Sequence, residues 1–382
     1  MRPEELSATL ASLSHTCRYR QRHAMQSEQG AKVIIDGQRY LSFASNDYLG
    51  LAGHPAMMNA LSLAAFRWGV GSGASHLVAG HFAIHDEVEL ALARFVGCEA
   101  ALLFSSGYAA NLAVISSLLK RGDAIFADRL NHASLVDACI QSRATFRRFR
   151  HNDVVHLEQL LDTTCARTRL IAVEAVYSMD GDMAPLQSLL ALAEHYNAWL
   201  LIDDAHGFGV LGEGRGSLAT IGSKHHRVLY MATLGKAAGT AGAFVAGSHE
   251  VIDWFINTAR SYIYTTALSP ALAATILTSL SLMESEPWRS QWLVTLIHAL
   301  VDRIRGAKLT LLPSQTPIQP IIIGTNTNTV NSAMRLREQG IWVPAIRPPT
   351  VAEGAARLRI SLTAQHSIAD IDRLVASLIC AV

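Results

Sequence analysis

The sequence predicts an α/β protein with a mostly parallel sheet in a large domain, followed by a smaller α+β domain. Two observations predict this class. From about residue 102, short apolar runs alternate with stretches of helical spacing, and near residue 281 that alternation gives way to a different order of elements. Alternation of this kind is typical of βαβ units, whereas a changed order indicates a separate domain.

The predicted strands of the large domain are apolar along their whole length. Strands with this composition are buried on both faces, as in parallel sheets covered by helices. We predict strands in AALLFSS, AIFAD, LIAVEAVYS, AWLLIDDAHG and VLYMATLGK, and helices in YAANLAVISSLL, HASLVDACIQS and PLQSLLALAEHY.

Three regions are expected along the chain. Residues 1–45 form a helix and a hairpin that turns within 35–40, residues 46–280 form the large domain, and residues 281–382 form the α+β domain. In the last region we predict helices over about 287–305, 330–339 and 368–378, and strands near 318–323, 341–345 and 356–362.

Composition excludes several classes of function. Half of the 382 residues are hydrophobic, 16% are charged, and the net charge is +1. A nucleic-acid-binding protein would need a clustered basic excess. The densest basic stretch, residues 143–153, is interpreted as a solvated strand edge. With Glu4 and Glu5 and no apolar run, the first residues do not resemble a signal peptide, so the cytoplasm is the expected location.

Neither a disulfide framework nor a metal centre is predicted. The five cysteines are scattered and form no CxxC pair. His76, His81 and His85 lie close in sequence, but we expect no carboxylate or cysteine to complete a metal site there.

Asp203 and Lys236 carry the main chemical signal. Each follows an apolar run that we interpret as a strand, and ligands of parallel sheets bind at the carboxyl ends of the strands. A buried carboxylate needs a cation or a donor, and a lysine among small residues has room beside it for a ligand. Together they fit a pyridoxal phosphate site, in which a lysine holds the cofactor covalently and an acid faces its ring nitrogen. A helix cap at Asp203 and a surface lysine at 236 are the structural alternatives.

Two further stretches fit the same cofactor. In SSGYAAN, residues 105–111, a glycine turn opens a predicted helix, and the amides at a helix start bind phosphate. An ordinary strand-to-helix turn explains this stretch equally well. His132, at the start of another predicted helix, is either a surface residue or a flat ring that stacks on the cofactor.

Seven motifs in order give the chain a family resemblance that covers nearly its whole length. They resemble the α-oxoamine synthases, which belong to the fold-type I, aspartate aminotransferase-like class of pyridoxal phosphate enzymes with a seven-stranded type of sheet. The motifs are SNDYLGL (45–51), SSGYAAN (105–111), DRLNHASL (128–135), SMDGD (178–182), DDAHGFGVLGEGRG (203–216), TLGKA (233–237) and AIRPPTV (345–351).

The resemblance implies a role for each matching residue. Catalysis would fall to Lys236, His132 and Asp203. Cofactor contacts would come from Gly107, Tyr108, His132, Ser178, Asp203, His206, Thr233 and Lys236, and from Thr265 and Thr266 across a dimer interface. Substrate contacts would come from Arg20, Asn46, His132, Arg347, Thr350 and Arg359, with Arg18 or Arg22 as alternatives to Arg20.

The resemblance also implies a reaction and partners. Pyridoxal 5′-phosphate would be the cofactor, and the homodimer would condense an amino acid with an acyl thioester and release carbon dioxide. The stretch after residue 345 is most similar to members of the family that use L-alanine and a pimeloyl thioester in biotin biosynthesis. The thioester carrier, coenzyme A or an acyl carrier protein, stays open. A relative of the glycine C-acetyltransferase type is the alternative.

Overall fold

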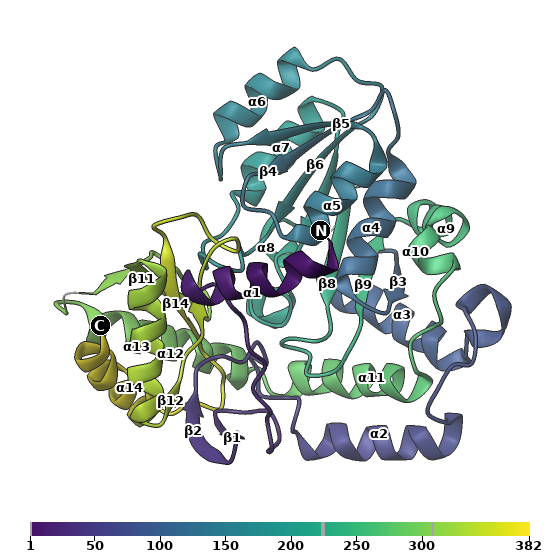
Figure 1. Cartoon of the computed structure of the whole chain (residues 1–382). Coiled ribbons are helices and arrows are strands. Elements are labelled where there is room, and N and C mark those ends of the chain that lie inside the picture. Colours follow the sequence, from purple (N-terminus) through teal and green to yellow (C-terminus); the bar gives the residue numbers. More distant parts are fainter. Residues whose placement is uncertain (1, 223–225, 308) are drawn as a thin grey trace. The chain divides into compact units, whose positions relative to one another are not determined.

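The computed structural model describes residues 2–222, 226–307 and 309–382 (Figure 1). The chain divides into two compact units. The larger comprises residues 51–178 and 183–290, and the smaller comprises residues 1–50, 179–182 and 291–382. The three regions expected from the sequence, divided at residues 45 and 280, stay a prediction.

A seven-stranded sheet forms the centre of the larger unit, as predicted. One strand, β9, is antiparallel to both of its neighbours, and the other six run in the same direction. The mostly parallel sheet is therefore confirmed. The spatial order is β3 (Ala100–Phe104), β9 (Ala243–Gly247), β8 (Val228–Thr233), β7 (Trp199–Asp203), β6 (Arg169–Glu174), β4 (Ala124–Asp128) and β5 (Thr145–Phe149).

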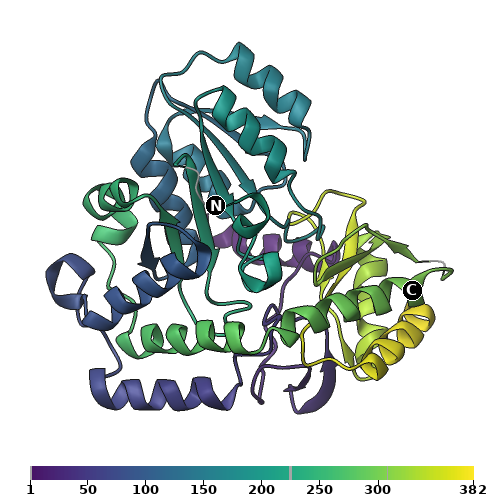
Figure 2. The same ribbon diagram turned by 180° about the vertical axis from the view of Figure 1, so that it is seen from behind.

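Helices cover both faces of this sheet, which explains why its strands are apolar throughout. Leu229 and Met231 pack into one buried cluster with α4 and α5, while Tyr230, between them, points to the opposite face. Figure 1 shows α4 and α5 in front of the sheet, and Figure 2 shows α7 on the other face. The helices of the larger unit are α2 (Pro55–Trp68), α3 (Ala83–Val96), α4 (Gly107–Leu118), α5 (Ala133–Ser142), α6 (Val154–Thr163), α7 (Leu186–His195), α8 (Leu218–Ile221), α9 (His249–Thr258), α10 (Arg260–Ile263) and α11 (Pro270–Ser285).

The basic stretch at residues 143–153 contains one of the two edge strands of the sheet. Strand β5 pairs only with β4, and Arg147 and Arg148 are exposed. The interpretation as a solvated strand edge is confirmed.

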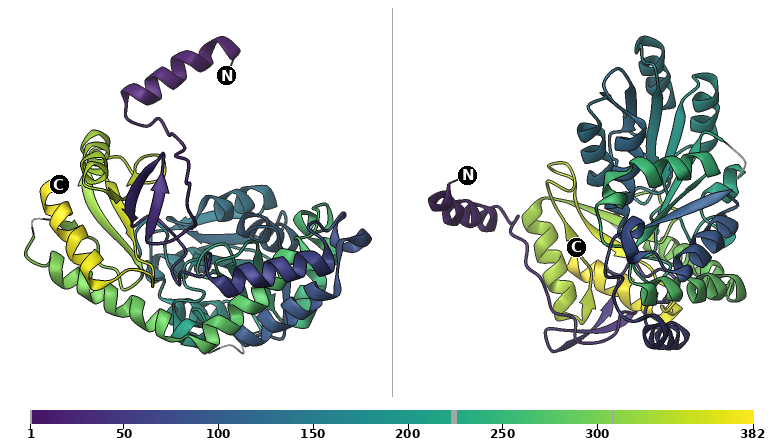
Figure 3. Two further views of the ribbon diagram at one scale, coloured as in Figure 1. Left: turned by 90° about the horizontal axis from the view of Figure 1, so that it is seen from below. Right: turned by 90° about the vertical axis from the view of Figure 1, so that its right-hand side faces the viewer.

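The smaller unit contains two sheets and four helices within the described residues. A three-stranded sheet has the order β1 (Lys32–Ile35), β2 (Gln38–Ser42) and β12 (Ile341–Trp342), and a four-stranded sheet has the order β10 (Thr310–Leu311), β11 (Ile318–Gly324), β14 (Ala356–Ser361) and β13 (Ala345–Ile346). The helices are α1 (Leu6–His15), most of α12 (Trp288–Ile304), α13 (Asn326–Glu338) and α14 (Ile368–Ala381). Figure 3 shows α1 standing away from the sheets of its own unit, and none of its residues is buried.

Two predicted boundaries in this unit were wrong. Helix α13 begins at Asn326, four residues before the predicted start, because the Thr325 hydroxyl accepts a hydrogen bond from Asn328 N and caps a polar first turn. The single strand predicted near 341–345 is two short strands in different sheets, β12 and β13. No helix among the described residues is long and apolar enough to cross a membrane.

Candidate active site

Acidic side chains end two neighbouring strands of the large sheet. Glu174 is the last residue of β6, Asp203 is the last residue of β7, and the two are paired in register. Strand β8 ends at Thr233, and Lys236 follows three residues later. Since parallel strands end at the same edge, these groups converge where ligands of α/β sheets bind.

A cavity of about 200 Å³ lies at this edge. Seven of the predicted site residues line it, and Ser178, Thr265 and Thr266 do not. The lining residues are Gly107, Tyr108, Asn111, His132, Ser134, Glu174, Asp203, Ala205, His206, Met231, Thr233 and Lys236.

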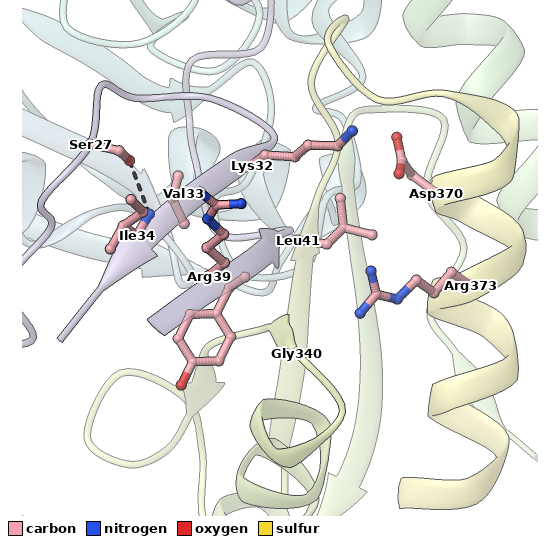
Figure 4. A pocket seen from close by; sticks show the side chains of 10 residues that line it. Ser27, Lys32, Val33, Ile34, Arg39, Leu41, Gly340, Asp370 and Arg373 are labelled. Carbon is pink, nitrogen blue, oxygen red and sulfur yellow. Dashed lines mark hydrogen bonds between the residues drawn. The ribbon is translucent and has the colours of Figure 1, made fainter. Parts of the chain in front are cut away.

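A larger cavity, of about 390 Å³, lies in the smaller unit (Figure 4). Its lining includes the charged residues Lys32, Asp370 and Arg373 and the apolar residues Val33 and Leu41. None of the predicted site residues lines this cavity, so size alone does not identify the site; the side-chain chemistry does.

Asp203 is buried and held by neutral donors. Asn111 Nδ2 donates to Asp203 Oδ2 at 2.8 Å, and the backbone N–H of Ala205 donates to Oδ1 at 3.0 Å. Burial raises the pKa of Asp203, whereas Asn111 and the positive charge of Lys236 lower it. A protonated ring nitrogen in the cavity would add a cationic donor to this carboxylate, which is the partner that a buried acid requires.

Lys236 shares the cavity with Asp203, and its Nζ lies 2.7 Å from His206 Nε2. The small residues that follow the lysine let its loop pack tightly. Gly239 has φ of +65°, and a Cβ there would lie 2.6 Å from Ala52 N. A larger residue at 239 would push the loop outward, so this glycine helps to place the lysine.

The imidazole of His132 is fixed by a chain of hydrogen bonds that reaches Asp203. His132 is the N-cap of α5, and its Nδ1 accepts from Ser134 N, with Ser134 Oγ 2.9 Å away. The Ser134 hydroxyl accepts from Asn111 Nδ2, so its own proton points to His132. Nδ1 is therefore an acceptor and Nε2 carries the proton in the neutral ring.

The start of α4 provides a phosphate-sized set of donors. Ser106 caps the helix, and the N–H groups of Gly107 and Tyr108 lie in the first turn, where an α-helix leaves its amides unpaired. No acidic residue occupies that turn. The hydroxyl of Tyr108 donates to Asp137, so this residue offers its backbone rather than its side chain. Thr233 lies beside Gly107, as an added Cβ on the glycine would be 4.0 Å from Thr233 Cβ.

Two residues of the cavity, Glu174 and Asn111, were not predicted from the sequence. Strand LIAVEAVYS was expected to run to Ser178, but β6 ends four residues earlier, where Ala175 N bonds to Asp203 O. The acid at the end of this strand is therefore Glu174, and Ser178 follows in the next turn. Asn111 lies inside α4, one turn after its start, where only the fold reveals that it faces Asp203.

Thr265 and Thr266 line a separate cavity of about 370 Å³. Ser75 and Thr266 form an isolated antiparallel bridge, and Leu77, Val78 and Tyr264 lie around the same cavity. The described chain does not bring these two threonines into the Lys236 cavity.

The predicted carboxylate-binding residues lie in the smaller unit, where two of them are in contact. Arg359 Nη1 donates to Asn46 Oδ1 at 3.2 Å and to Ser361 Oγ at 2.9 Å. The Arg359 side chain is buried, with 5% of the residue exposed. Asn46 and Ser361 are neutral partners, and the planar fork of an arginine matches the two oxygens of a carboxylate.

The predicted acyl-binding residues also meet in this unit. Arg20 Nη2 donates to Thr350 Oγ1 at 3.0 Å. Burial and the nearby positive charge of Arg20 lower the pKa of Arg347, so two cations lie close together. Arg18, the alternative to Arg20, pairs with Glu353 instead.

The three histidines lie close together, and a carboxylate lies beside one of them; the prediction that they form no metal site stays a prediction. His81 Nε2 lies 2.9 Å from Asp86 Oδ1, and His81 Nδ1 lies 2.8 Å from His76 Nδ1. Ligand atoms of His76, His81 and His85 lie within 4.8 Å of one another. Both nitrogens of His85 bond to backbone, however, one to Phe82 N and the other to Leu268 O.

A second buried acid, Asp204, supports the loop that carries His206. Its Oδ2 accepts from Tyr230 Oη at 2.6 Å and from Ser217 N at 2.7 Å. Burial raises the pKa of Asp204 to about 7, and these donors oppose the rise. We expect Tyr230→Phe to lower the free energy of unfolding by about 1–3 kcal/mol, because a buried acceptor loses its donor.

Denaturant unfolding checks this loss. Tyr196→Phe is the matched control, since Tyr196 also donates to a carboxylate, Asp162, but at the surface. A Tyr230→Phe variant no less stable than the control would contradict the role of Asp204.

The residues of the cavity thus fit pyridoxal phosphate: a buried acid with neutral donors, a lysine, a fixed imidazole and unpaired helix amides share one space. The family model described as aminotransferase class I and II matches residues 38–378, which defines the class of the protein. A serine palmitoyltransferase structure from Sphingomonas wittichii superposes with a TM-score of 0.93 at 30% identity, covering 99% of this chain and 96% of the other.

Curated relatives identify the family to which the chain belongs within this class. The 8-amino-7-oxononanoate synthase of Chromobacterium violaceum is 60% identical over 98% of this chain and 97% of its own, and that of Herminiimonas arsenicoxydans is 56% identical over 98% of each. A solved synthase of this name from Francisella tularensis has a TM-score of 0.78 at 29% identity, covering 89% of this chain and 97% of its own. The chain belongs to the 8-amino-7-oxononanoate synthase family.

Membership confirms several predictions. The fold is that of the fold-type I enzymes, the cofactor is pyridoxal 5′-phosphate, and the protein is an acyltransferase-type enzyme. The resemblance to the α-oxoamine synthases is confirmed as well.

Proposed function

We propose that the protein condenses L-alanine with a pimeloyl thioester to give 8-amino-7-oxononanoate, carbon dioxide and a free thiol, a step of biotin biosynthesis. The observation that carries the proposal is the meeting of Lys236 and Asp203 in one cavity of a chain from this family. When bound, the cofactor supplies an electron sink that stabilises negative charge on the amino-acid Cα.

The residues of the chain have distinct tasks in this proposal. Lys236 Nζ would hold the cofactor covalently, and the same amine would move the proton at the Cα of alanine. Asp203 would keep the ring nitrogen protonated, and His132 would lie against the ring with Nε2 as its hydrogen-bond donor. The amides of Gly107 and Tyr108 and the hydroxyl of Thr233 bind the phosphate, while Ser178 and His206 bond to the ring hydroxyl.

Substrate binding is assigned to the smaller unit. The guanidinium of Arg359, with Asn46 beside it, binds the carboxylate of alanine. Arg347 is a second candidate for that carboxylate, and Arg20 with Thr350 contacts the acyl substrate. Arginine suits these tasks because its planar fork binds a carboxylate through two parallel hydrogen bonds.

We also propose a homodimer, with Thr265 and Thr266 reaching the phosphate of the partner site. Apolar side chains exposed on the larger unit support it: Leu63, Phe66, Val78 and Tyr264 are exposed, Phe66 by 89%. Leu63 and Phe66 lie one turn apart on α2, and Val78 and Tyr264 line one cavity; contiguous exposed apolar surface is typical of interfaces. A sedimentation mass of a single chain would contradict the dimer.

Thiol release tests the reaction. With L-alanine, the holoenzyme is expected to release thiol from pimeloyl-CoA or from pimeloyl-acyl carrier protein, and mass spectrometry should find 8-amino-7-oxononanoate. Glycine with acetyl-CoA and L-serine with palmitoyl-CoA serve as comparisons. A higher kcat/KM for either comparison pair would refute the substrate assignment.

A further inference from the structure

We propose that Glu174 is a positioning residue whose buried carboxyl group holds the two turns that carry His132 and Ser178. The inference rests on the proposed function, because those turns matter only if His132 and Ser178 contact the cofactor. Neither the sequence motifs nor the family match assigns Glu174 a task.

Glu174 connects two turns that are distant in sequence. Its Oε1 accepts the backbone N–H of His132 at 2.5 Å, and its carboxyl group also accepts the backbone N–H of Ser178. The residue is 3% exposed and lines the cavity. One buried side chain thus fixes the backbone beneath both predicted cofactor contacts.

The charges around Glu174 favour its neutral form. The ionisable groups that face it are Asp203, paired with it in register, Lys236, and His132. Burial and the neighbouring Asp203 raise the pKa of Glu174 to about 8, although the two N–H donors and Lys236 lower it. A second buried negative charge beside Asp203 would be unfavourable. Burial and the neighbouring Asp203 therefore favour the protonated form of Glu174.

If Glu174 acts as a neutral acceptor, its substitutions should have different effects than if it must be a charged carboxylate. Glutamine at 174 keeps the size and the acceptor oxygen without charge, whereas methionine keeps the size and offers the two N–H groups no acceptor of comparable strength. We expect Glu174→Gln to bind pyridoxal phosphate within about threefold of the wild-type Kd. Glu174→Met is expected to weaken binding at least tenfold, about 1.4 kcal/mol.

Two measurements that need no substrate test the role of Glu174. One is the Kd of the apo-protein for pyridoxal phosphate, and the other is the infrared carbonyl band of a protonated carboxyl group. The band is expected at pH 6, should fade as the pH rises through about 8, and should lose intensity in Glu174→Gln. Glu89 is the matched control. Burial also raises the pKa of Glu89 to about 8, and its carboxyl group accepts the backbone N–H of Leu103, away from the cavity. Glu89→Gln should remove its own band and leave the cofactor Kd unchanged.

Three results would overturn the proposal. They are a glutamine variant as damaged as the methionine variant, a methionine variant that binds cofactor like the wild type, and an infrared band at pH 6 that Glu174→Gln does not reduce. Thermal unfolding of each variant separates misfolding from local loss. If these measurements agree with the proposal but thiol release fails, the proposed substrates are wrong and the role of Glu174 stands.

Discussion

The Lys236→Ala variant is expected to lose at least about 10³-fold in kcat. In the proposed function the same amine holds the cofactor and moves the Cα proton, and proton transfer by a positioned side chain alone contributes about 10²–10⁴-fold. The variant should fold, because Lys236 is followed by small residues and its side chain faces a cavity. Thiol release with L-alanine and pimeloyl-CoA measures the effect.

Lys120→Ala is the control for this variant, since Lys120 is exposed and lies outside the cavity. Added methylamine should partly restore proton transfer to Lys236→Ala and leave the control unchanged. Turnover by Lys236→Ala within tenfold of the wild type would show that another group performs both tasks.

Asp203→Asn is expected to lower kcat by a factor of about 10² to 10⁴. The substitution keeps the shape but removes the charge that we propose faces the ring nitrogen, and breaking a buried charge pair costs about 3–5 kcal/mol. In this variant an NH₂ group replaces one of the two carboxylate oxygens near the Asn111 side chain. Cofactor affinity should therefore fall as well. Steady-state kinetics and cofactor titration measure the two effects separately.

Asp204→Asn tests whether any buried acid at this strand end would have the same effect. Asp204 is also fully buried, but it bonds to Tyr230 and Ser217 on the other side of the strand. We expect it to lower stability and to leave kcat per folded molecule nearly unchanged. Equal losses of kcat in Asp203→Asn and Asp204→Asn would contradict a specific task for Asp203.

The sequence predicted five of the seven strands and most of the cavity, because these depend on local signals. Apolar runs defined the strands, and polar residues after them, such as Asp203 and Thr233, fell at the same edge because parallel strands end together. His132 was predicted at a helix start and is the N-cap of α5.

What the sequence could not supply depends on contacts between distant segments. Glu174 was hidden inside an apolar run whose end is set by pairing with Asp203. Asn111 lies within a helix, and the sequence around it does not indicate its contact with Asp203, 92 residues later. The carboxylate beside His81 was missed because Asp86 reaches it from the first turn of α3.

Reduction of the holoenzyme with borohydride, followed by peptide mapping, tests the central claim most directly. The reduced cofactor is expected on the peptide that contains Lys236, and the other four lysines should stay unmodified. Cofactor mass on a different lysine, with an unmodified amine at 236, would contradict the account.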